Sequence, residues 1–305
     1  MEESEVVEPI PQEPKPNQRP SLWRWILGTF IILISWLVIG GIFTVLSASF
    51  FDLDLGALTG TDKESLEIVR GYEPWQAASA VLVSFIPLLV APLLLHRFLL
   101  KRPFRELFTR SDRNFAREVG IGAAVMTLLL MGTGIPDMIL NGDAYTWTFD
   151  AAKFLPYLLI AFTLIPIQTT AEEVFYRGWI QQRLENGRRS IWLVSVLGGA
   201  LFALPHLGNP EVSGNVLLPI LGYGSTGFML TWVTMRDKSM GLAVGAHAAN
   251  NILAGLLISS SDSALPSVSL WTTPEIDWGP AAVVSVLLIP IFIWLTRKWS
   301  AKVAS

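Results

Sequence analysis

The stretch "FLPYLLIAFTLIPIQTTAEEVFYRGWI" (residues 154–180) decides how the rest of the chain is interpreted. Its first part is apolar enough for a membrane-embedded helix, yet Glu172, Glu173 and Arg177 follow in the same run. On insertion scales, one charged side chain at the centre of such a helix costs about 2.5 to 3.5 kcal/mol. Three of them in one helix predict a polar site inside a membrane protein rather than an ordinary lipid-facing span.

The composition agrees with a membrane protein. Hydrophobic residues make up 51% of the 305 residues and charged residues only 15%, whereas soluble domains carry about 25% charged residues. The chain has no cysteine, which excludes disulfides, thiol catalysis and thiolate metal sites. Its basic residues lie in short loops between apolar stretches, so the expected partner is membrane lipid and not nucleic acid. No pattern in the sequence addresses the oligomeric state.

Eight segments are long and apolar enough to cross about 30 Å of hydrocarbon. They are residues 23–46, 76–99, 118–136, 154–182, 191–206, 214–235, 240–259 and 279–296. The sequence therefore predicts an all-α, polytopic membrane helix bundle of about eight transmembrane helices, forming one transmembrane domain over residues 21–305. Residues 1–20 are acidic and proline-rich, and we expect them to form a disordered N-terminal tail.

Lysine and arginine indicate how the bundle is oriented. If both termini are cytoplasmic, 18 of the 22 basic residues fall in segments on the inner side and three on the outer side, while Arg177 lies within a span. Such an excess of basic residues marks cytoplasmic loops. We therefore expect both termini to be cytoplasmic and the protein to lie in the plasma membrane as a multi-pass protein.

The predicted spans enclose few ionisable side chains. Glu172 and Glu173 are the two acidic residues expected outside loops and tails, and Arg177, His206 and His247 accompany them. Glu173 and Arg177 are four residues apart, with the acid first, which favours an ion pair on one helix face. Glu172 points about 100° away and is left for chemistry. Embedded ionisable residues are candidates for a functional site by default.

Two further pairs carry polar groups to a similar depth. Phe202 and His206 are four residues apart, as are His247 and Asn251, so each pair shares a helix face. Because the expected depths of Glu172, His206 and His247 overlap, the three spans can form one site. A carboxylate, two imidazoles and an amide, without serine or cysteine, suit the activation of water by Glu172 as general base, with a donor for the oxyanion.

A bound zinc ion is the alternative that these residues leave open. Zinc would take Glu172, His206 and His247 as ligands, although the HExxH pattern of one large metalloprotease class is absent. We favour a mechanism that needs no cofactor, because Asn251 is a poor metal ligand and no cysteine or aspartate completes the set.

Three motifs in this region match a known family. "EEVFYR" (172–177), "FALPH" (202–206) and "HAANN" (247–251) occur in the order of the EExxxR, FxxxH and HxxxN motifs. Over about residues 154–255 the chain thus resembles the CAAX-protease and bacteriocin-processing (CPBP) family of intramembrane proteases, which includes CAAX prenyl protease type 2 and Abi-like proteins. Many members of this family are described as metalloproteases.

The resemblance implies an all-helical bundle and peptide-bond hydrolysis within the membrane. It implies that Glu172 is the catalytic glutamate, that His206 helps to hold the water, and that His247 and Asn251 form the oxyanion side. Glu173, Arg177 and Phe202 would support them. The expected function is therefore an intramembrane endopeptidase acting on a membrane-anchored protein or peptide, with a prenylated CAAX protein as one possible class of substrate.

Two other functions are compatible with the sequence. A non-proteolytic scaffold or bacteriocin self-immunity protein could keep the same fold, although it would not need both histidines. A proton-coupled transporter could use Glu172 and the histidines as a relay. Transporters more often contain inverted repeats with interrupted spans in matching halves, and the sequence contains no such repeat.

Overall fold

The computed structural model describes residues 21–185, 189–212, 214 and 216–301, so the predicted tail, residues 1–20, lies outside the described residues. Eight long helical units within them correspond to the eight predicted segments, with ends that agree to about five residues. Four are single helices of the second half: α11 (Ile191–His206), α12 (Leu217–Asp237), α13 (Gly241–Leu256) and α14 (Trp278–Ala301). The all-α fold class predicted from the sequence is confirmed.

The other four units lie in the first half, and three are interrupted. The first joins α1 (Leu22–Ile34), a π-helical segment (Ser35–Gly40) and α2 (Gly41–Phe51), and the second joins α5 (Pro74–Leu82), a 3₁₀ turn (Val83–Phe85) and α6 (Ile86–Phe98). Then come the unbroken α8 (Phe115–Leu140) and α9 (Ala151–Glu173), the latter continued by a π-helical segment (Val174–Gln181) and α10 (Gln182–Glu185).

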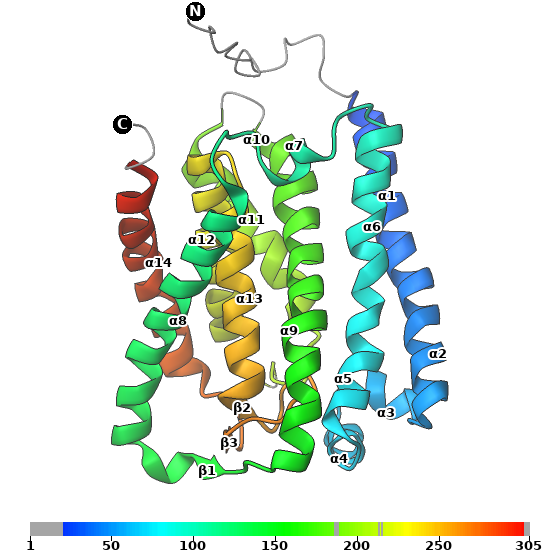
Figure 1. The fold of residues 1–305 in the computed structure, drawn as a ribbon, viewed down its shortest axis with the longest axis vertical. Coiled ribbons are helices and arrows are strands. Elements are labelled where there is room, and N and C mark those ends of the chain that lie inside the picture. The colour runs from blue at the N-terminus through cyan, green and yellow to red at the C-terminus, as the bar shows by residue number, and fades with distance from the viewer. Residues whose placement is uncertain (1–20, 186–188, 213, 215, 302–305) are drawn as a thin grey trace, which may run out of the picture.

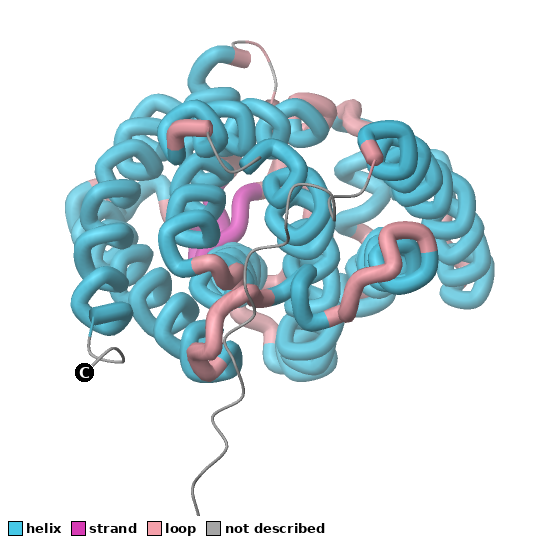
Figure 2. Tube along the Cα trace, turned by 90° about the horizontal axis from the view of Figure 1, so that it is seen from above, coloured by secondary structure: helices cyan, strands magenta, loops and turns pink. Residues whose placement is uncertain are grey.

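Short elements that the sequence did not predict connect these units. They are the helices α3 (Leu55–Thr59), α4 (Lys63–Arg70) and α7 (Arg105–Phe108), a 3₁₀ turn (Gly142–Ala144), and the strands β1 (Thr146–Trp147), β2 (Ile258–Ser260) and β3 (Trp271–Thr273). The strands form one small sheet in the order β1-β3-β2, antiparallel between β1 and β3 and parallel between β2 and β3. Seen from above, the strands lie beneath the interior of the ring of helices (Figure 2).

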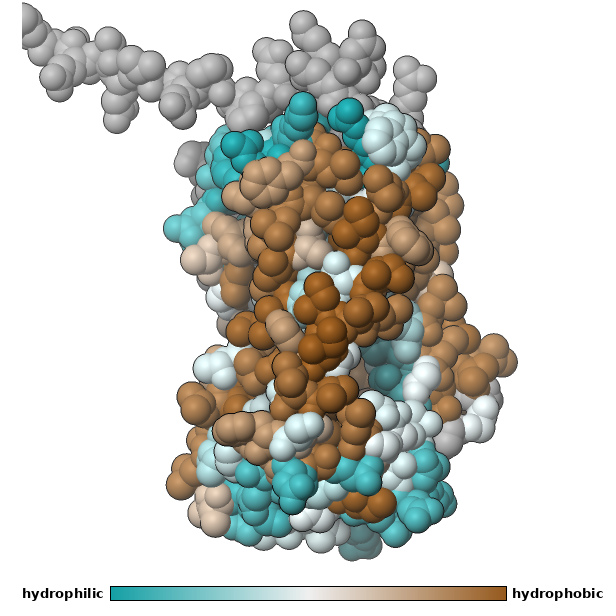
Figure 3. All heavy atoms as spheres, turned by 90° about the vertical axis from the view of Figure 1, so that its right-hand side faces the viewer, coloured by the Kyte–Doolittle hydropathy of each residue, from teal (hydrophilic) through white to brown (hydrophobic). Residues whose placement is uncertain are grey.

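The ends of the bundle are distinct. α1 begins and α14 ends at the end that also holds α7 and α10, while α3, α4 and the strands lie at the opposite end (Figure 1). The face formed by the first two helical units carries a broad hydrophobic band between hydrophilic ends (Figure 3). Large apolar side chains such as Phe30, Leu37 and Leu46 are exposed there, as expected of a multi-pass membrane protein.

The number of membrane crossings stays a prediction. Within the described residues, five helical units are long and apolar enough to cross: Leu22–Phe51, Pro74–Phe98, Phe115–Leu140, Ala151–Glu185 and Trp278–Arg297. By contrast, α11 and α13 have 16 residues each, which corresponds to about 24 Å against about 30 Å of hydrocarbon. These two short helices carry His206 and His247, so part of the predicted site is built on helices shorter than the hydrocarbon is thick.

Glycines allow α13 to lie at the centre of the bundle, where it packs against α8, α9 and α12. A Cβ atom on Gly245 of α13 would lie 1.9 Å from the carbonyl oxygen of Val119 in α8, and one on Gly122 of α8 would lie 2.2 Å from that of Leu242. The two backbones are therefore in direct contact, the close approach that small residues permit between membrane helices.

One prediction about charges is wrong. Acidic residues other than Glu172 and Glu173 were expected in loops or tails, yet Glu118 and Asp137 lie within α8, near its two ends. Glu118 is buried. The helix begins before its apolar stretch, because Asn114 caps it by accepting a hydrogen bond from the Arg117 amide, and it continues past that stretch to Leu140.

Candidate active site

The two adjacent glutamates lie where the helical geometry changes. α9 ends at Glu173, and the π-helical segment begins at Val174. Such segments are rare and are frequently found at functional sites. Glu173 is fully buried and Glu172 is 8% exposed, so this helix places both carboxylates inside the bundle.

Glu173 holds two partners at once. Its Oε1 accepts hydrogen bonds from Arg177 Nη1 at 3.0 Å and from His247 Nδ1 at 2.8 Å. The ion pair expected from the spacing of Glu173 and Arg177 is therefore present, with both side chains 0% exposed. Arg177 Nη2 also donates to the carbonyl oxygen of Gly227 in α12, at 3.1 Å. Glu173 and Arg177 thereby tie α9 and its continuation to α12 and α13.

His247 lies between the two carboxylates. While its Nδ1 bonds Glu173, its Nε2 lies 3.5 Å from Glu172 Oε2. Glu172 accepts no hydrogen bond from any residue that the structure describes, and its Oε2 is buried. The Glu173–His247 bond could not be found in the sequence, because helical periodicity predicts neighbours within one helix and not across two.

His206 is held by its own helix and by two aromatic rings. Its Nδ1 donates to the Phe202 carbonyl oxygen in its own helix at 2.7 Å, and its ring packs between Phe202 and Tyr223, with centroid distances of 4.7 Å and 4.4 Å. Among the described residues no ion pair joins His206 to Glu172, and the expected role of His206 beside this carboxylate stays a prediction. The bond to the helix backbone directs the imidazole along α11.

Phe202 connects the parts of the site. Its ring contacts His247 edge-to-face, with centroids 5.6 Å apart, and the Arg177 guanidinium carbon lies 4.9 Å from its centroid. The same ring packs on His206. The close approach of α12 permits this, because a Cβ atom on Gly227 would lie 2.6 Å from Phe202 Cβ. A small residue that lets two helices approach closely thus also shapes the site.

Amide side chains form a second contact between α9 and α13. Asn251 Nδ2 donates to Gln168 Oε1 at 3.1 Å, and Asn250 Nδ2 donates to Asn251 Oδ1 at 3.1 Å. Gln168 is 7% exposed, and none of the three motifs indicates this residue. Its position four residues before Glu172, in an otherwise apolar helix, places it on the same helix face and was the signal that could have identified it.

Tyr223 and Glu211 were also missed. The Tyr223 hydroxyl donates to Glu211 Oε1 at 2.5 Å, and the Ala264 amide donates to Glu211 Oε2 at 2.9 Å. Glu211 is buried in the loop after α11, and its own carbonyl oxygen accepts from the Trp278 indole at 2.8 Å. This network joins two loops, α12 and α14, and it holds the tyrosine that packs on His206.

The predicted zinc ligands do not fit a metal ion. In the described ranges, no group of three histidine, aspartate or glutamate side chains is placed to hold one. Glu172, His206 and His247 do not form such a group, and the Nδ1 atoms of the two histidines are already bonded to the Phe202 carbonyl oxygen and to Glu173. We therefore assign no step to a metal ion.

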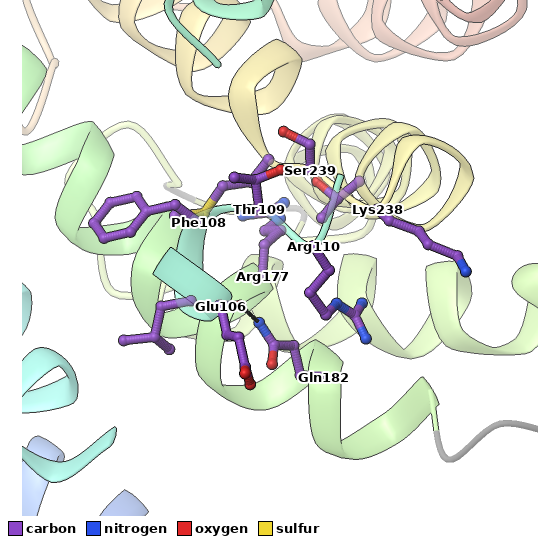
Figure 4. A pocket seen from close by; sticks show the side chains of 11 residues that line it. Glu106, Phe108, Thr109, Arg110, Arg177, Gln182, Lys238 and Ser239 are labelled. Atoms are coloured by element: carbon purple, nitrogen blue, oxygen red, sulfur yellow. Dashed lines mark hydrogen bonds between the residues drawn. The ribbon is translucent and has the colours of Figure 1, made fainter. Parts of the chain in front are cut away.

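A small cavity lies on the far side of Arg177 (Figure 4). Its polar lining includes Thr109, Arg110, Arg177, Gln182, Lys238 and Ser239. Gln182 Nε2 donates to the Glu106 carbonyl oxygen across it at 2.6 Å. Neither Glu172 nor His247 lines this cavity, so it is separate from the carboxylates of the candidate site.

Comparisons with known proteins agree with the motifs. Residues 151–253 match the type II CAAX prenyl endopeptidase Rce1-like family, which confirms the resemblance predicted from the sequence. The chain is also 27% identical over 288 residues to the "Uncharacterized protein YyaK" of Bacillus subtilis (strain 168), covering 92% of this chain and 95% of the relative. No solved structure shows a significant match.

Proposed function

We propose that this multi-pass membrane protein, whose residues 151–253 match an endopeptidase family, hydrolyses a peptide bond of a membrane-associated protein or peptide. The observation that carries the proposal is the buried carboxylate of Glu172. It accepts no hydrogen bond from the described residues and lies 3.5 Å from His247 Nε2. Burying a carboxylate without a hydrogen-bond partner lowers the stability of the protein, so such a residue is a candidate for a functional role.

Water is the nucleophile in the mechanism that we infer. A water molecule about 2.8 Å from both Glu172 Oε2 and His247 Nε2 has ordinary hydrogen-bond lengths to each. Glu172 takes one proton as the water oxygen attacks the carbonyl carbon of the scissile bond. The tetrahedral intermediate then collapses as Glu172 passes this proton to the amine nitrogen, and the C–N bond breaks. The products are a carboxylic acid and an amine, which become a carboxylate and an ammonium group once the acid proton passes to the amine.

Glu173 positions the histidine for this step. Because Glu173 Oε1 accepts from Nδ1, the Nδ1 proton and the ring orientation of His247 are fixed, and Nε2 faces the water. Arg177 balances the charge of Glu173. Asn251 supplies an amide donor towards the oxyanion, and His206, held between two aromatic rings, is the second imidazole of the site.

The Glu172→Gln variant tests the proposal in a way that does not require an identified substrate. Cells of the source organism would carry either the wild-type gene or the variant as the sole copy, and new protein termini in their membranes would be quantified by mass spectrometry. We expect termini that depend on the wild-type protein and disappear with Glu172→Gln, because the general base is lost. Identical sets of termini at equal protein levels would contradict the proposal.

The same experiment separates hydrolysis from the two other functions. A scaffold or immunity protein would keep its phenotype in Glu172→Gln and would generate no termini. A transporter would lose proton-coupled uptake in membrane vesicles while the termini stayed unchanged. Gln181→Met is the matched control, because Gln181 is a buried polar residue of the same helix that bonds Glu185 rather than any residue of the site. It should leave the termini unchanged.

A further inference from the structure

Gln168 is a buried polar residue that the mechanism above does not use. It lies in α9, four residues before Glu172, and therefore on the same helix face. Only 7% of its surface is exposed. A polar side chain held inside a membrane helix is expensive and marks a functional position by default, so its contacts are informative.

α9 and α13 meet at two successive levels. At the first level, Glu172 Oε2 faces His247 Nε2 at 3.5 Å, and at the second, Gln168 Oε1 accepts from Asn251 Nδ2 at 3.1 Å. On each helix the second residue is four positions from the first. The second level is therefore about 6 Å along the helices from the first, which is close enough for one substrate peptide group to contact both.

The hydrogen bonds between the amides run in one direction. Asn250 Nδ2 donates to Asn251 Oδ1, and Asn251 Nδ2 donates to Gln168 Oε1. Because the oxygen of Gln168 is the acceptor, its Nε2 amide group remains a donor. Among the residues that the structure describes, no acceptor takes a hydrogen bond from that group. Gln168 Nε2 is not one of the fully buried atoms that lack a partner, so it is open to a further acceptor, and a substrate carbonyl oxygen beside Glu172 would provide one.

We propose that Gln168 Nε2 donates a hydrogen bond to the carbonyl oxygen of the bond that is cleaved, so that Gln168 and Asn251 together form a two-amide oxyanion site. This inference rests on the proposed function. At the first level, the water activated by Glu172 attacks the carbonyl carbon. At the second level, the two amides stabilise the negative charge that develops on the carbonyl oxygen. Gln168 also positions Asn251, whose remaining N–H can reach the same oxygen.

Kinetics in proteoliposomes test the inference. The probe is a synthetic peptide that spans the most abundant wild-type-dependent cleavage site found in the membranes. Gln168→Met keeps the length of the side chain and removes both hydrogen-bonding groups. We expect it to lower kcat about 100-fold while KM stays within twofold, because a donor to the oxyanion acts chiefly in the transition state. Asn251→Ala should lower kcat similarly, and the double variant should be little worse than either single variant.

Controls keep this inference distinct from the proposed function. Gln181→Met, which removes a buried glutamine from the continuation of the same helix, should keep wild-type kcat. If the Met variant does not fold, Gln168→Asn retains an amide but withdraws it, and we expect it to lower kcat about tenfold. Wild-type kcat in the folded Gln168 variants, or a loss confined to KM, overturns the inference alone. A wild-type protein without any dependent cleavage site overturns the proposed function and this inference with it.

Discussion

Two buried carboxylate pairs can be compared in this molecule. The first is Glu172 and Glu173 in the candidate site, and the second is Glu118 and Asp237 at the end of the bundle where α8 begins and α12 ends. The second pair is shared with Arg113, whose Nη1 lies 3.6 Å from Glu118 and 3.1 Å from Asp237.

The second pair also has other partners. Arg236 donates to Asp237 at 2.6 Å and to the Ile293 carbonyl oxygen in α14 at 3.0 Å, and the Ser239 hydroxyl donates to Glu118. Two arginines therefore face two carboxylates, and both arginines are partly exposed, with side-chain exposures of 28% and 18%. Charge balance and access to solvent suit a structural role for this cluster of Arg113, Glu118, Arg236 and Asp237, which joins three helices and is called the clamp below.

The candidate site lacks that balance. Two carboxylates share one arginine, which is 0% exposed, and the histidine between them bonds the carboxylate that the arginine already neutralises. Glu172 accepts no hydrogen bond from the described residues, whereas Glu118, whose Oε1 also lacks a donor, accepts one from the Ser239 hydroxyl at Oε2. The difference shows that burial of acidic residues alone does not distinguish a structural cluster from a reactive one, whereas incomplete compensation does.

The largest expected effect concerns Glu172. Glu172→Gln should lower the cleavage rate by about 10²- to 10⁴-fold, the contribution of a general base, and should leave the unfolding free energy within about 1 kcal/mol of wild type. Cleavage of the peptide probe and unfolding in mixed SDS micelles measure the two quantities. A loss of stability equal to that of a clamp variant would show that Glu172 is a structural residue and would remove the contrast between the pairs.

The sequence alone predicted much of this contrast. Hydropathy located all eight helical units, because each apolar stretch is long, and i to i+4 spacing predicted the Glu173–Arg177 bond. It did not predict that Glu173 also binds His247, because nothing local shows which face of α13 meets α9. Nor did it predict that the Phe202 carbonyl oxygen takes the Nδ1 of His206. The clamp was missed because Glu118 and Asp237 were expected to lie in loops or tails.

Glu173→Gln should affect both stability and rate. A neutral side chain leaves Arg177 charged and buried without its carboxylate, which should lower the unfolding free energy by about 3 to 5 kcal/mol. The cleavage rate should also fall, because His247 loses its anionic acceptor. Glu173→Gln/Arg177→Met should recover part of the stability and none of the rate. Recovery of both would mean that Glu173 serves only to neutralise Arg177.

Asp237→Asn should disturb the clamp without affecting catalysis. The partners of Asp237, Arg113 and Arg236, are partly exposed to solvent. We therefore expect the unfolding free energy to fall by about 2 to 3 kcal/mol, less than for a fully buried pair. The kcat per folded molecule should equal that of wild type in proteoliposomes. A clear loss of kcat with intact folding would show that the clamp also acts on the site.

The smallest effect is expected at an ion pair that is still more exposed. Arg110 Nη2 lies 2.5 Å from Glu185 Oε2, and the side chains are 34% and 15% exposed. Because water solvates both partners, Arg110→Met should lower the unfolding free energy by less than about 1 kcal/mol, and added salt should reduce the difference. Together with Asp237→Asn and Glu173→Gln, it gives a series in which the cost rises as exposure falls. If Arg110→Met cost as much as Asp237→Asn, exposure would not determine the cost, and the clamp and the site would have to be distinguished by their hydrogen-bond partners alone.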